Sequence, residues 1–209
     1  MILIPEISTV LILVPRTGSG SLRRAVLREY PEAMQIYRHM EADGIPYGYD
    51  TWRRVGVVRH PIDRMWSLYR FLGKFGGGQH DPAFVASLRN SVDRPFGDWL
   101  IHNEIVFTSP YDRANRGRFW PGYACNHPIP ENRKSQAVYI RPDLGTEYWN
   151  FEHLDQLAAS LGVTIQAREN ATTHDPAPAL EQEAEAYARS VFAWDFSVTE
   201  AAQCRAASR

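Results

Sequence analysis

The chain has 209 residues, of which 44% are hydrophobic and 22% are charged, which is the composition of an ordinary soluble globular protein. This length supports one α/β domain with a sizeable hydrophobic core and is short for two such domains. With 23 basic and 24 acidic residues the net charge is −1, so the composition excludes a general electrostatic attraction to nucleic acid or to an anionic membrane surface.

The cysteines and the N-terminal segment indicate the cellular compartment in which the protein is expected. Only Cys125 and Cys204 occur, far apart in the sequence, so neither a disulfide framework nor a metal-ligand spacing is present. Residues 1–14 are apolar, but they lack a basic start, contain Pro5 and Glu6 and have no cleavage-type ending, which argues against a secretory signal. Since no apolar run approaches the ~18 residues that a membrane span needs, we expect a cytoplasmic protein with no membrane partner. Because no metal-ligand spacing is present, we also expect no bound metal.

The first predicted elements are a strand and a helix joined by a loop of small residues. Residues 11–14 form a short apolar run that is typical of a buried strand, and a helix is predicted over 21–30. A cluster of small and hydroxyl residues lies between them, at 15–20. Because N–H groups at a helix start point outward and the helix dipole adds positive charge there, this junction is predicted to bind a phosphate or sulfate.

A second strand-to-helix junction follows. Residues 34–40 are a mixed segment that predicts an edge strand, and residues 41–49 predict a loop. Residues 54–59 predict a strand, after which Pro61 starts a helix over 62–74. Helical spacing predicts that the apolar residues of this helix face inward and that its polar residues lie on the other side; the polar residues are Asp63, Arg64, Ser67, Arg70 and Lys74.

The remainder of the chain continues the alternation of strands and helices. Residues 107–134 show no period and predict a substrate-facing loop. The pattern as a whole predicts an α/β fold with a central parallel β-sheet flanked by helices, in a single domain over 1–198 followed by a tail over 199–209. Ligands in such folds bind at the carboxyl ends of strands. The other predicted elements are one or two short helices within 81–99, a strand at 136–140, a helix at 151–161, a strand at 163–166 and a helix at 180–192.

The small-residue loop differs from a nucleoside-triphosphate loop. That loop needs a Lys followed by Ser or Thr at the end of a G-x-x-x-x-G spacing. Here Gly18 and Gly20 are two residues apart, the loop has no Lys, and its cation precedes the glycines at Arg16. An ATP or GTP site is therefore disfavoured, and a kinase with a degenerate loop remains an alternative.

The segment PRTGSGSL, residues 15–22, resembles the 5′-phosphosulfate loop of sulfotransferases, which commonly has Lys where this chain has Arg16. These enzymes transfer a sulfuryl group from 3′-phosphoadenosine 5′-phosphosulfate (PAPS) to a hydroxyl or an amine. The resemblance implies a three-layer P-loop-like α/β fold with PAPS as its cofactor. The cofactor-binding residues that it implies in this loop are Arg16, Thr17, Gly18, Ser19, Gly20, Ser21 and Leu22.

A second segment, VVRHPIDRMWSLYRF over 57–71, resembles the family's 3′-phosphate motif, in which a strand ends in Arg and a Ser follows in the next helix. Arg59 and Ser67 lie eight residues apart, which is the spacing of that motif. An Arg at a strand end can form paired hydrogen bonds to a phosphate, and a Ser can add a hydroxyl donor. Residues 149–162 and 186–196 also resemble family segments, with the greatest likeness to carbohydrate sulfotransferases that modify uronic acids.

The resemblance implies roles in sulfuryl transfer. Arg16 would bind the 5′-phosphosulfate and stabilise the charge on the leaving phosphate, since such transfers depend mainly on positioning and on charge stabilisation. His39 is the predicted base for the acceptor hydroxyl, because it precedes Arg59 by 20 residues and uronyl-type members place a catalytic His at a similar spacing. Alternatives to it that lie close in the sequence are Glu41, Asp43 and Asp50.

The acceptor is predicted to be a small molecule or a saccharide, with no nucleic acid partner. Arg133 and Lys134 are further candidates for contacting the cofactor or an acidic sugar. A PAPS-binding protein without turnover is a second alternative, because Arg16 departs from the family's Lys. The sequence indicates no oligomeric state. A sugar stacked on rings beside an acidic group would suit the residues Arg113, Arg116, Arg118, Phe119 and Trp120.

Overall fold

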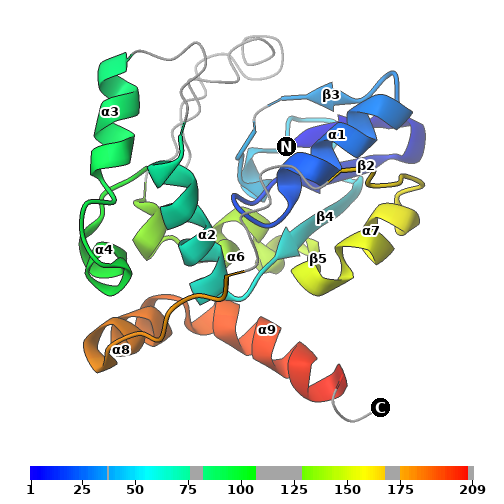
Figure 1. Ribbon diagram of the computed structural model, residues 1–209. Helices are drawn as coiled ribbons and strands as arrows, with labels where there is room; N and C mark the ends of the chain where they lie inside the picture. The colour runs from blue at the N-terminus through cyan, green and yellow to red at the C-terminus, as the bar shows by residue number, and fades with distance from the viewer. Residues whose placement is uncertain (37, 76–81, 107–128, 168–174, 207–209) are drawn as a thin grey trace.

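The protein contains a five-stranded mixed β-sheet (Figure 1). The computed structural model describes residues 1–36, 38–75, 82–106, 129–167 and 175–206. Within these ranges the strand order is β3-β1-β2-β4-β5. The strands are β1 Ile2–Ile4, β2 Thr9–Ile12, β3 Met34–Gln35, β4 Arg53–Val58 and β5 Glu147–Asn150.

Strand direction in the sheet is mixed. Strands β2, β4 and β5 run parallel, in a register that pairs Leu11 with Val55 and Val57 with Trp149. Strand β1 runs the other way and pairs antiparallel with both β2 and β3. The prediction of a parallel sheet is therefore wrong for β1, because the apolar N-terminus folds back through a 3-10 turn at Pro5–Ile7, and so short a connection can join only antiparallel neighbours.

The predicted helices after both strand junctions, the short helices before the long loop and the helix over 180–192 are confirmed within a few residues at each end. Short 3-10 turns occur at Ala42–Gly44, Glu131–Arg133, Pro142–Leu144 and Phe151–His153. The helices of the described ranges are α1 Ser19–Glu29, α2 Pro61–Gly73, α3 Pro82–Asn90, α4 Phe96–His102, α6 Gln136–Ile140, α7 Leu154–Ser160, α8 Gln182–Val191 and α9 Ala193–Ala206.

Two strand predictions in the C-terminal third are wrong. Residues Gln136–Ile140 form helix α6. Its N-cap is Ser135, whose Oγ accepts a hydrogen bond from the Ala137 N–H at 3.2 Å. Residues 163–166 form no strand. The fifth strand, β5, has the sequence EYWN and exposed or half-buried side chains, so it lacks the apolar run that predicts the other strands.

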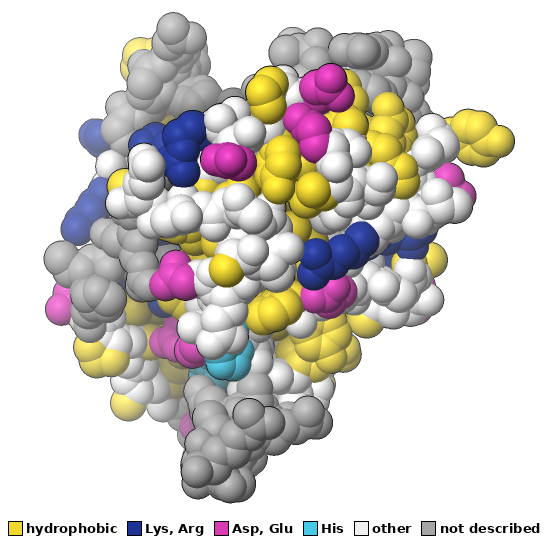
Figure 2. Space-filling view, turned by 90° about the vertical axis from the view of Figure 1, so that its right-hand side faces the viewer, with side chains coloured by type: hydrophobic (Ala, Val, Ile, Leu, Met, Phe, Trp, Pro, Cys, Tyr) yellow, Lys and Arg dark blue, Asp and Glu magenta, His cyan; other side chains and the backbone are white. Residues whose placement is uncertain are grey.

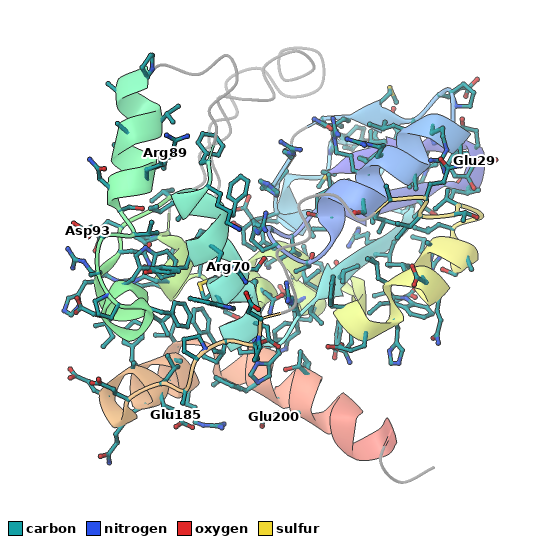
Figure 3. The ribbon with its side chains drawn as sticks, viewed as in Figure 1. Glu29, Arg70, Arg89, Asp93, Glu185 and Glu200 are labelled. Atoms are coloured by element: carbon teal, nitrogen blue, oxygen red, sulfur yellow. The ribbon has the colours of Figure 1, made fainter. Side chains whose placement is uncertain are left out.

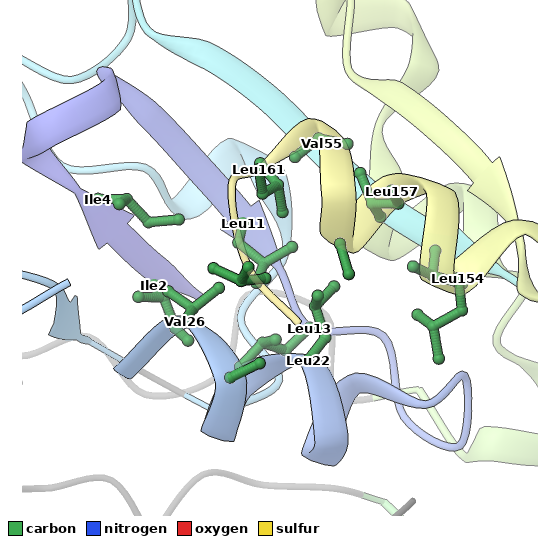
Figure 4. Close-up of a cluster of buried hydrophobic side chains, with 14 residues drawn as sticks. Ile2, Ile4, Leu11, Leu13, Leu22, Val26, Val55, Leu154, Leu157 and Leu161 are labelled. Carbon is green, nitrogen blue, oxygen red and sulfur yellow. The ribbon is translucent and has the colours of Figure 1, made fainter. Parts of the chain in front are cut away.

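Helices α1 and α7 cover one face of the sheet (Figure 4). Leu22 and Val26 of α1 and Leu157 of α7 are fully or almost fully buried, and they pack with sheet residues such as Leu11 and Val55. Burial of such side chains contributes about 1.5–3 kcal/mol each relative to full exposure. This packing fixes the start of α1 next to the end of β2.

The opposite face of the sheet is covered by α6, by α9 and by the side chains of Ile36, Met40 and Ala42. Tyr139 and Ile140 of α6 pack there against the sheet. Gly56 of β4 permits this close approach, since a Cβ at that position would touch Ile140 Cδ1. The expectation of a sheet flanked by helices is thus confirmed, with helices on both faces.

A third cluster of buried side chains lies beside the sheet, between α2, α4, α8 and α9. Met65 and Leu68 of α2 meet Trp99 of α4 and Phe192 in this cluster. Helix α9 continues to Ala206, so the expectation of a tail from residue 199 is wrong for residues 199–206, which are helical. The physical reason is that the start of α9 is packed into two of the clusters, so the helix extends from a fixed base.

The face of the molecule in Figure 2 shows no dominant charge of one sign. Figure 2 shows basic and acidic side chains interspersed on one face of the molecule, in keeping with the net charge of −1. Among the helices of the described ranges, none is both long and apolar enough to cross a membrane. Affinity for an anion must therefore come from cations placed individually at a site.

Candidate functional site

The parallel strands β2, β4 and β5 bring their carboxyl ends to one edge of the sheet. From β2 the chain passes into α1 and returns to β3 on one side, whereas from β4 it passes into α2 and returns to β5 on the other side. Ligands in α/β proteins bind where the connections of two adjacent parallel strands diverge in this way. Both predicted phosphate motifs lie at this point, at the ends of β2 and β4.

The loop after β2 holds two residues in the left-handed backbone region, Arg16 with φ 66° and Gly18 with φ 75°. The buried Thr17 hydroxyl donates to a backbone carbonyl of the same loop at 3.0 Å, so its role is within the loop. A Cβ at Gly18 would lie 2.7 Å from Leu154 Cδ2 and 3.0 Å from Phe151 Cε2. Glycine is therefore required at this position both by the backbone and by the packing against the segment after β5.

Helix α1 starts directly after this loop. The first intrahelical hydrogen bond runs from the Leu22 N–H to the Gly18 carbonyl at 3.2 Å, and the N-cap residue, Gly18, has no side chain that could cap the helix. The N–H groups of Ser19, Gly20 and Ser21 precede that bond and lie at the positive end of the helix dipole. This arrangement favours a bound anion. The Leu22 side chain, by contrast, is part of the core.

Arg16 reaches from the first motif to the second. Its Nε and Nη2 both donate to Ser67 Oγ, at 3.2 and 2.9 Å, across 51 positions of sequence. Its guanidinium carbon lies 4.6 Å from the centre of the Phe71 ring. Burial, and then the positive charge of Arg59, lower the pKa of Arg16 to about 10, so Arg16 keeps its charge at neutral pH.

Arg59 stands beside the same loop. Its Nη1 donates to the Arg16 carbonyl at 3.4 Å, and its guanidinium carbon lies 4.7 Å from the centre of the Phe151 ring. Burial lowers the pKa of Arg59, although the carboxylates of Asp63 and Glu152 act in the opposite direction. In the described part of the chain the Arg59 guanidinium forms no ion pair with a carboxylate. A partly buried cation in this state has a strong electrostatic preference for an added anion.

Ser67, predicted on the polar side of its helix, opposite the inward apolar face, is only 3% exposed, so this side is also buried at Ser67. The reason is that one face of α2 packs into the helical cluster, while the loop after β2 approaches another face, where Arg16 donates to Ser67. Arg64, predicted on the same polar side, is fully buried and pairs with Glu131 at 3.0 Å. Its Nη2 also donates to the Lys134 carbonyl at 2.8 Å.

Lys134 is likewise buried, at 2% exposure. Its Nζ lies 2.6 Å from Glu41 Oε1 and 4.2 Å from the centre of the Tyr139 ring. Arg133 is exposed and pairs with Glu104 at 2.8 Å. The two neighbours therefore differ in environment, and the Lys134 charge is matched inside the protein by the carboxylate of Glu41.

The predicted base His39 lies against the end of β2. Its Nδ1 is 2.8 Å from the Leu13 carbonyl, so in the neutral ring Nδ1 carries the hydrogen and the lone pair is on Nε2. Burial lowers the pKa of His39 to about 3, which outweighs the opposite effect of that hydrogen bond. Its alternatives are differently placed: Glu41 and Asp43 form ion pairs at 2.6 Å with Lys134 and Arg141, and Asp50 is exposed.

The chain that leads into α8 is held against α2. Arg70, labelled in Figure 3, pairs with Asp175 at 3.0 Å, and the Trp66 indole N–H donates to the Asp175 carbonyl at 3.2 Å. Trp66 and Arg70 both belong to the second motif segment, residues 57–71, so this contact is made by that segment. The residues expected to face the acceptor lie outside the described residues; they are Arg113, Arg116, Arg118, Phe119 and Trp120.

Three residues of the site were not predicted as functional from the sequence. Arg16 lies over the ring of Phe71, and Arg59 lies over the ring of Phe151. The third residue, Gln136, forms hydrogen bonds to the backbone of Arg59. The helical spacing of Phe71 from Ser67 could have indicated the first contact. No local signal indicates the other two, because they arise from segments distant in sequence.

Comparison with known proteins does not assign this chain to a family. No family model matches this chain, no curated protein matches it, and no solved structure matches it. In the described ranges no group of three or more His, Cys, Asp or Glu side chains could hold a metal ion. The residues that indicate a function are therefore Arg16, Arg59 and Ser67, together with the start of α1.

Proposed function

We propose that this chain is a sulfotransferase that transfers a sulfuryl group from PAPS to an acceptor hydroxyl, with a saccharide as the acceptor. The observation that carries the proposal is the meeting of the two motifs. Arg16 of the loop donates twice to Ser67 of the second motif, and Arg59 lies against the same loop. PAPS has anionic groups at both ends of its ribose, so one such ligand would engage both motifs together.

The residues present suit these two anionic groups. The start of α1, at the positive end of the helix dipole, and the charged Arg16 would hold the 5′-phosphosulfate. Arg59 and the Ser67 hydroxyl would hold the 3′-phosphate. The proposal includes the finer architecture, a three-layer P-loop-like domain, for which the helices on both faces of the sheet are the supporting observation.

PAPS, when bound, supplies an activated sulfuryl group whose leaving group is a phosphate. Arg16 is still charged at neutral pH and would stabilise the negative charge that develops on that phosphate. His39 is neutral at pH 7, and its Nε2 would accept the proton of the acceptor hydroxyl. A group with a pKa of about 3 is a weak base, and the negative charge of an acidic sugar close to the ring would raise this pKa.

The test is calorimetric titration of 3′-phosphoadenosine 5′-phosphate (PAP), the desulfated cofactor, into the wild type, Arg59→Ala and Arg53→Ala. Arg53 is the matched control because it lies at the other end of β4 and pairs with Glu147 on the surface. We expect PAP to bind the wild type and Arg53→Ala alike, and to bind Arg59→Ala at least about tenfold more weakly. Failure of the wild type to bind PAP would refute the proposal, and binding of ATP in its place would favour a kinase.

A PAPS-binding protein without turnover is a second candidate, and the low pKa of His39 is the observation that favours it. Transfer of labelled sulfate from PAPS to a panel of uronic-acid glycans distinguishes the two. Transfer that is lost in His39→Ala, while PAP binding is retained, would support the enzyme. Tight PAP binding with neither transfer nor hydrolysis of PAPS would support the binding protein.

A further inference from the structure

The backbone of Arg59 extends beyond the sheet. The last residue of β4 with a strand partner is Val58, which pairs with Asn150 of β5. The peptide groups of Arg59 therefore need hydrogen-bond partners from elsewhere, because buried backbone groups are costly to leave unpaired. A single side chain supplies both: Gln136 Oε1 accepts from the Arg59 N–H at 2.9 Å, and Gln136 Nε2 donates to the Arg59 carbonyl at 2.7 Å.

Gln136 is itself held by helix α9. Both carboxylate oxygens of Asp195 accept from the Gln136 backbone N–H, at 2.9 and 3.1 Å. The hydroxyl of Ser135 donates to Asp195 Oδ1 at 2.6 Å. Gln136 and Asp195 are each fully buried, so their side chains have few alternative positions. Hydrogen bonds thus run without interruption from α9, through the first residue of α6, to the end of β4.

We infer that Gln136 is a positioning residue for Arg59 and that Asp195 holds Gln136 in place; this inference rests on the proposed function, in which Arg59 binds the 3′-phosphate. The two bonds of the Gln136 amide fix the orientation of the Arg59 backbone where the chain turns from β4 into α2. This orientation determines where the guanidinium stands relative to Ser67 and the start of α1. A fixed guanidinium loses less conformational freedom when a phosphate binds.

A purely structural role predicts different behaviour from a positioning role. If Gln136 only satisfied buried backbone groups, its loss would lower stability and weaken every ligand of the site to a similar extent. If it positions Arg59, its loss weakens ligands that carry a 3′-phosphate more than ligands that lack it. The ratio of the affinities for PAP and for adenosine 5′-phosphate, which has no 3′-phosphate, therefore separates the two roles.

The experiment measures both affinities by calorimetry in the wild type, Gln136→Met and Asp195→Asn. We expect the preference for PAP to fall about tenfold in Gln136→Met, which removes both bonds to Arg59. A smaller fall is expected in Asp195→Asn, which keeps one acceptor for the Gln136 N–H. Asn132→Leu is the matched control: Asn132 is a buried amide that donates to the Leu100 and Ile101 carbonyls, and its loss should reduce stability without changing the preference.

A conservative variant adds a pH profile that a structural role would not produce. In Gln136→Glu the protonated carboxyl group can donate and accept as the amide does, whereas the carboxylate can only accept. For Gln136→Glu, the preference for PAP over adenosine 5′-phosphate is divided by the wild-type preference at the same pH. This quotient should increase as the pH is lowered from about 8 to about 5.5, because burial favours the neutral form of the carboxyl group. Gln136→Met should show no such rise.

The outcomes distinguish this inference from the proposed function. Absence of PAP binding to the wild type would overturn both. PAP binding to the wild type with an unchanged preference in Gln136→Met, or an equal loss in Asn132→Leu, would overturn the positioning role of Gln136 and leave the proposed function standing.

Discussion

At the scale of single residues, Gly18 combines a backbone requirement with a packing requirement. Its φ is 75°, and a Cβ there would approach Leu154 and Phe151 at 2.7 and 3.0 Å. Gly145 has a similar φ of 73°, but a Cβ there would meet no atom within 4 Å, so this residue isolates the backbone requirement. The two glycines form a natural pair for mutation.

We predict that Gly145→Ala lowers the free energy of unfolding by about 1 kcal/mol through backbone strain alone. Gly18→Ala should lower it by about 2–4 kcal/mol, because overpacking against the segment after β5 adds to the same strain. Denaturant unfolding of the two variants measures both values. Equal losses in the two variants would show that the contacts of Gly18 with Leu154 and Phe151 do not matter.

His39 gives a second prediction at this scale, on pH. Its pKa is about 3 in the folded protein and close to 6.5 in the unfolded chain, so the unfolded chain takes up the proton first as the pH falls. The free energy of unfolding should therefore decrease below about pH 6.5, by up to about 1.4 kcal/mol per pH unit from this residue. His39→Asn, which keeps a donor for the Leu13 carbonyl, should flatten the profile between about pH 6.5 and pH 5.

The control for the pH profile is His102→Asn. His102 lies exposed on α4, where its Nδ1 is 3.0 Å from Asp98 Oδ1. This variant should keep the wild-type dependence over the same interval. A wild-type profile that His39→Asn does not change would mean that the imidazole is as well solvated in the folded protein as in the unfolded chain.

At the scale of elements, α6 approaches β4 closely because the strand has glycine at position 56. A Cβ at Gly56 would touch Ile140 Cδ1 and would lie 3.4 Å from Ile12 Cβ. We predict that Gly56→Ala lowers the free energy of unfolding by about 1–3 kcal/mol by overpacking. Ile140→Val, which removes the Cδ1 atom, should cost about 0.5–1.5 kcal/mol when made alone.

The double variant Gly56→Ala with Ile140→Val should be more stable than the sum of the two losses predicts, because the removed methyl makes room for the added one. Denaturant unfolding of the four proteins of this cycle gives the coupling energy. Additive losses would mean that α6 and β4 accommodate the Cβ by another shift.

At the scale of the whole molecule, the proposed ligand would link segments that are distant in sequence. A ligand that binds only the folded protein stabilises it by about 2.7 kcal/mol at 100 times its dissociation constant. We therefore predict that PAP raises the melting temperature, and that this rise shrinks from about 0.05 M to about 0.5 M NaCl as the charges are screened. Thermal unfolding with PAP and with adenosine measures this. An increase that is equal for both ligands or independent of salt would contradict binding through Arg16 and Arg59.

The features that the sequence predicted correctly are those with a local physical cause. Short apolar runs predicted β2 and β4, helical spacing predicted α2 and α8, and small residues before α1 predicted a turn with an open helix start. Each depends on neighbours within a few residues, so composition and periodicity suffice. The same local patterns produced the resemblance from which Arg16, Arg59 and Ser67 were chosen as candidates.

Other features depend on contacts between distant segments, and only the tertiary structure decided them. Residues Gln136–Ile140 are apolar enough for a strand, but Asp195 of α9 bonds their first N–H and favours a helix. The direction of β1, the burial of Ser67 and the pairing of Lys134 with Glu41 likewise follow from where other segments pack. The sequence alone thus determined the elements that have a local pattern, namely β2, β4, α1, α2 and α8. Long-range packing decided the other elements, the strand directions, the burial of side chains and the groups that meet at the site, because the contacts of the site join residues that no local pattern relates.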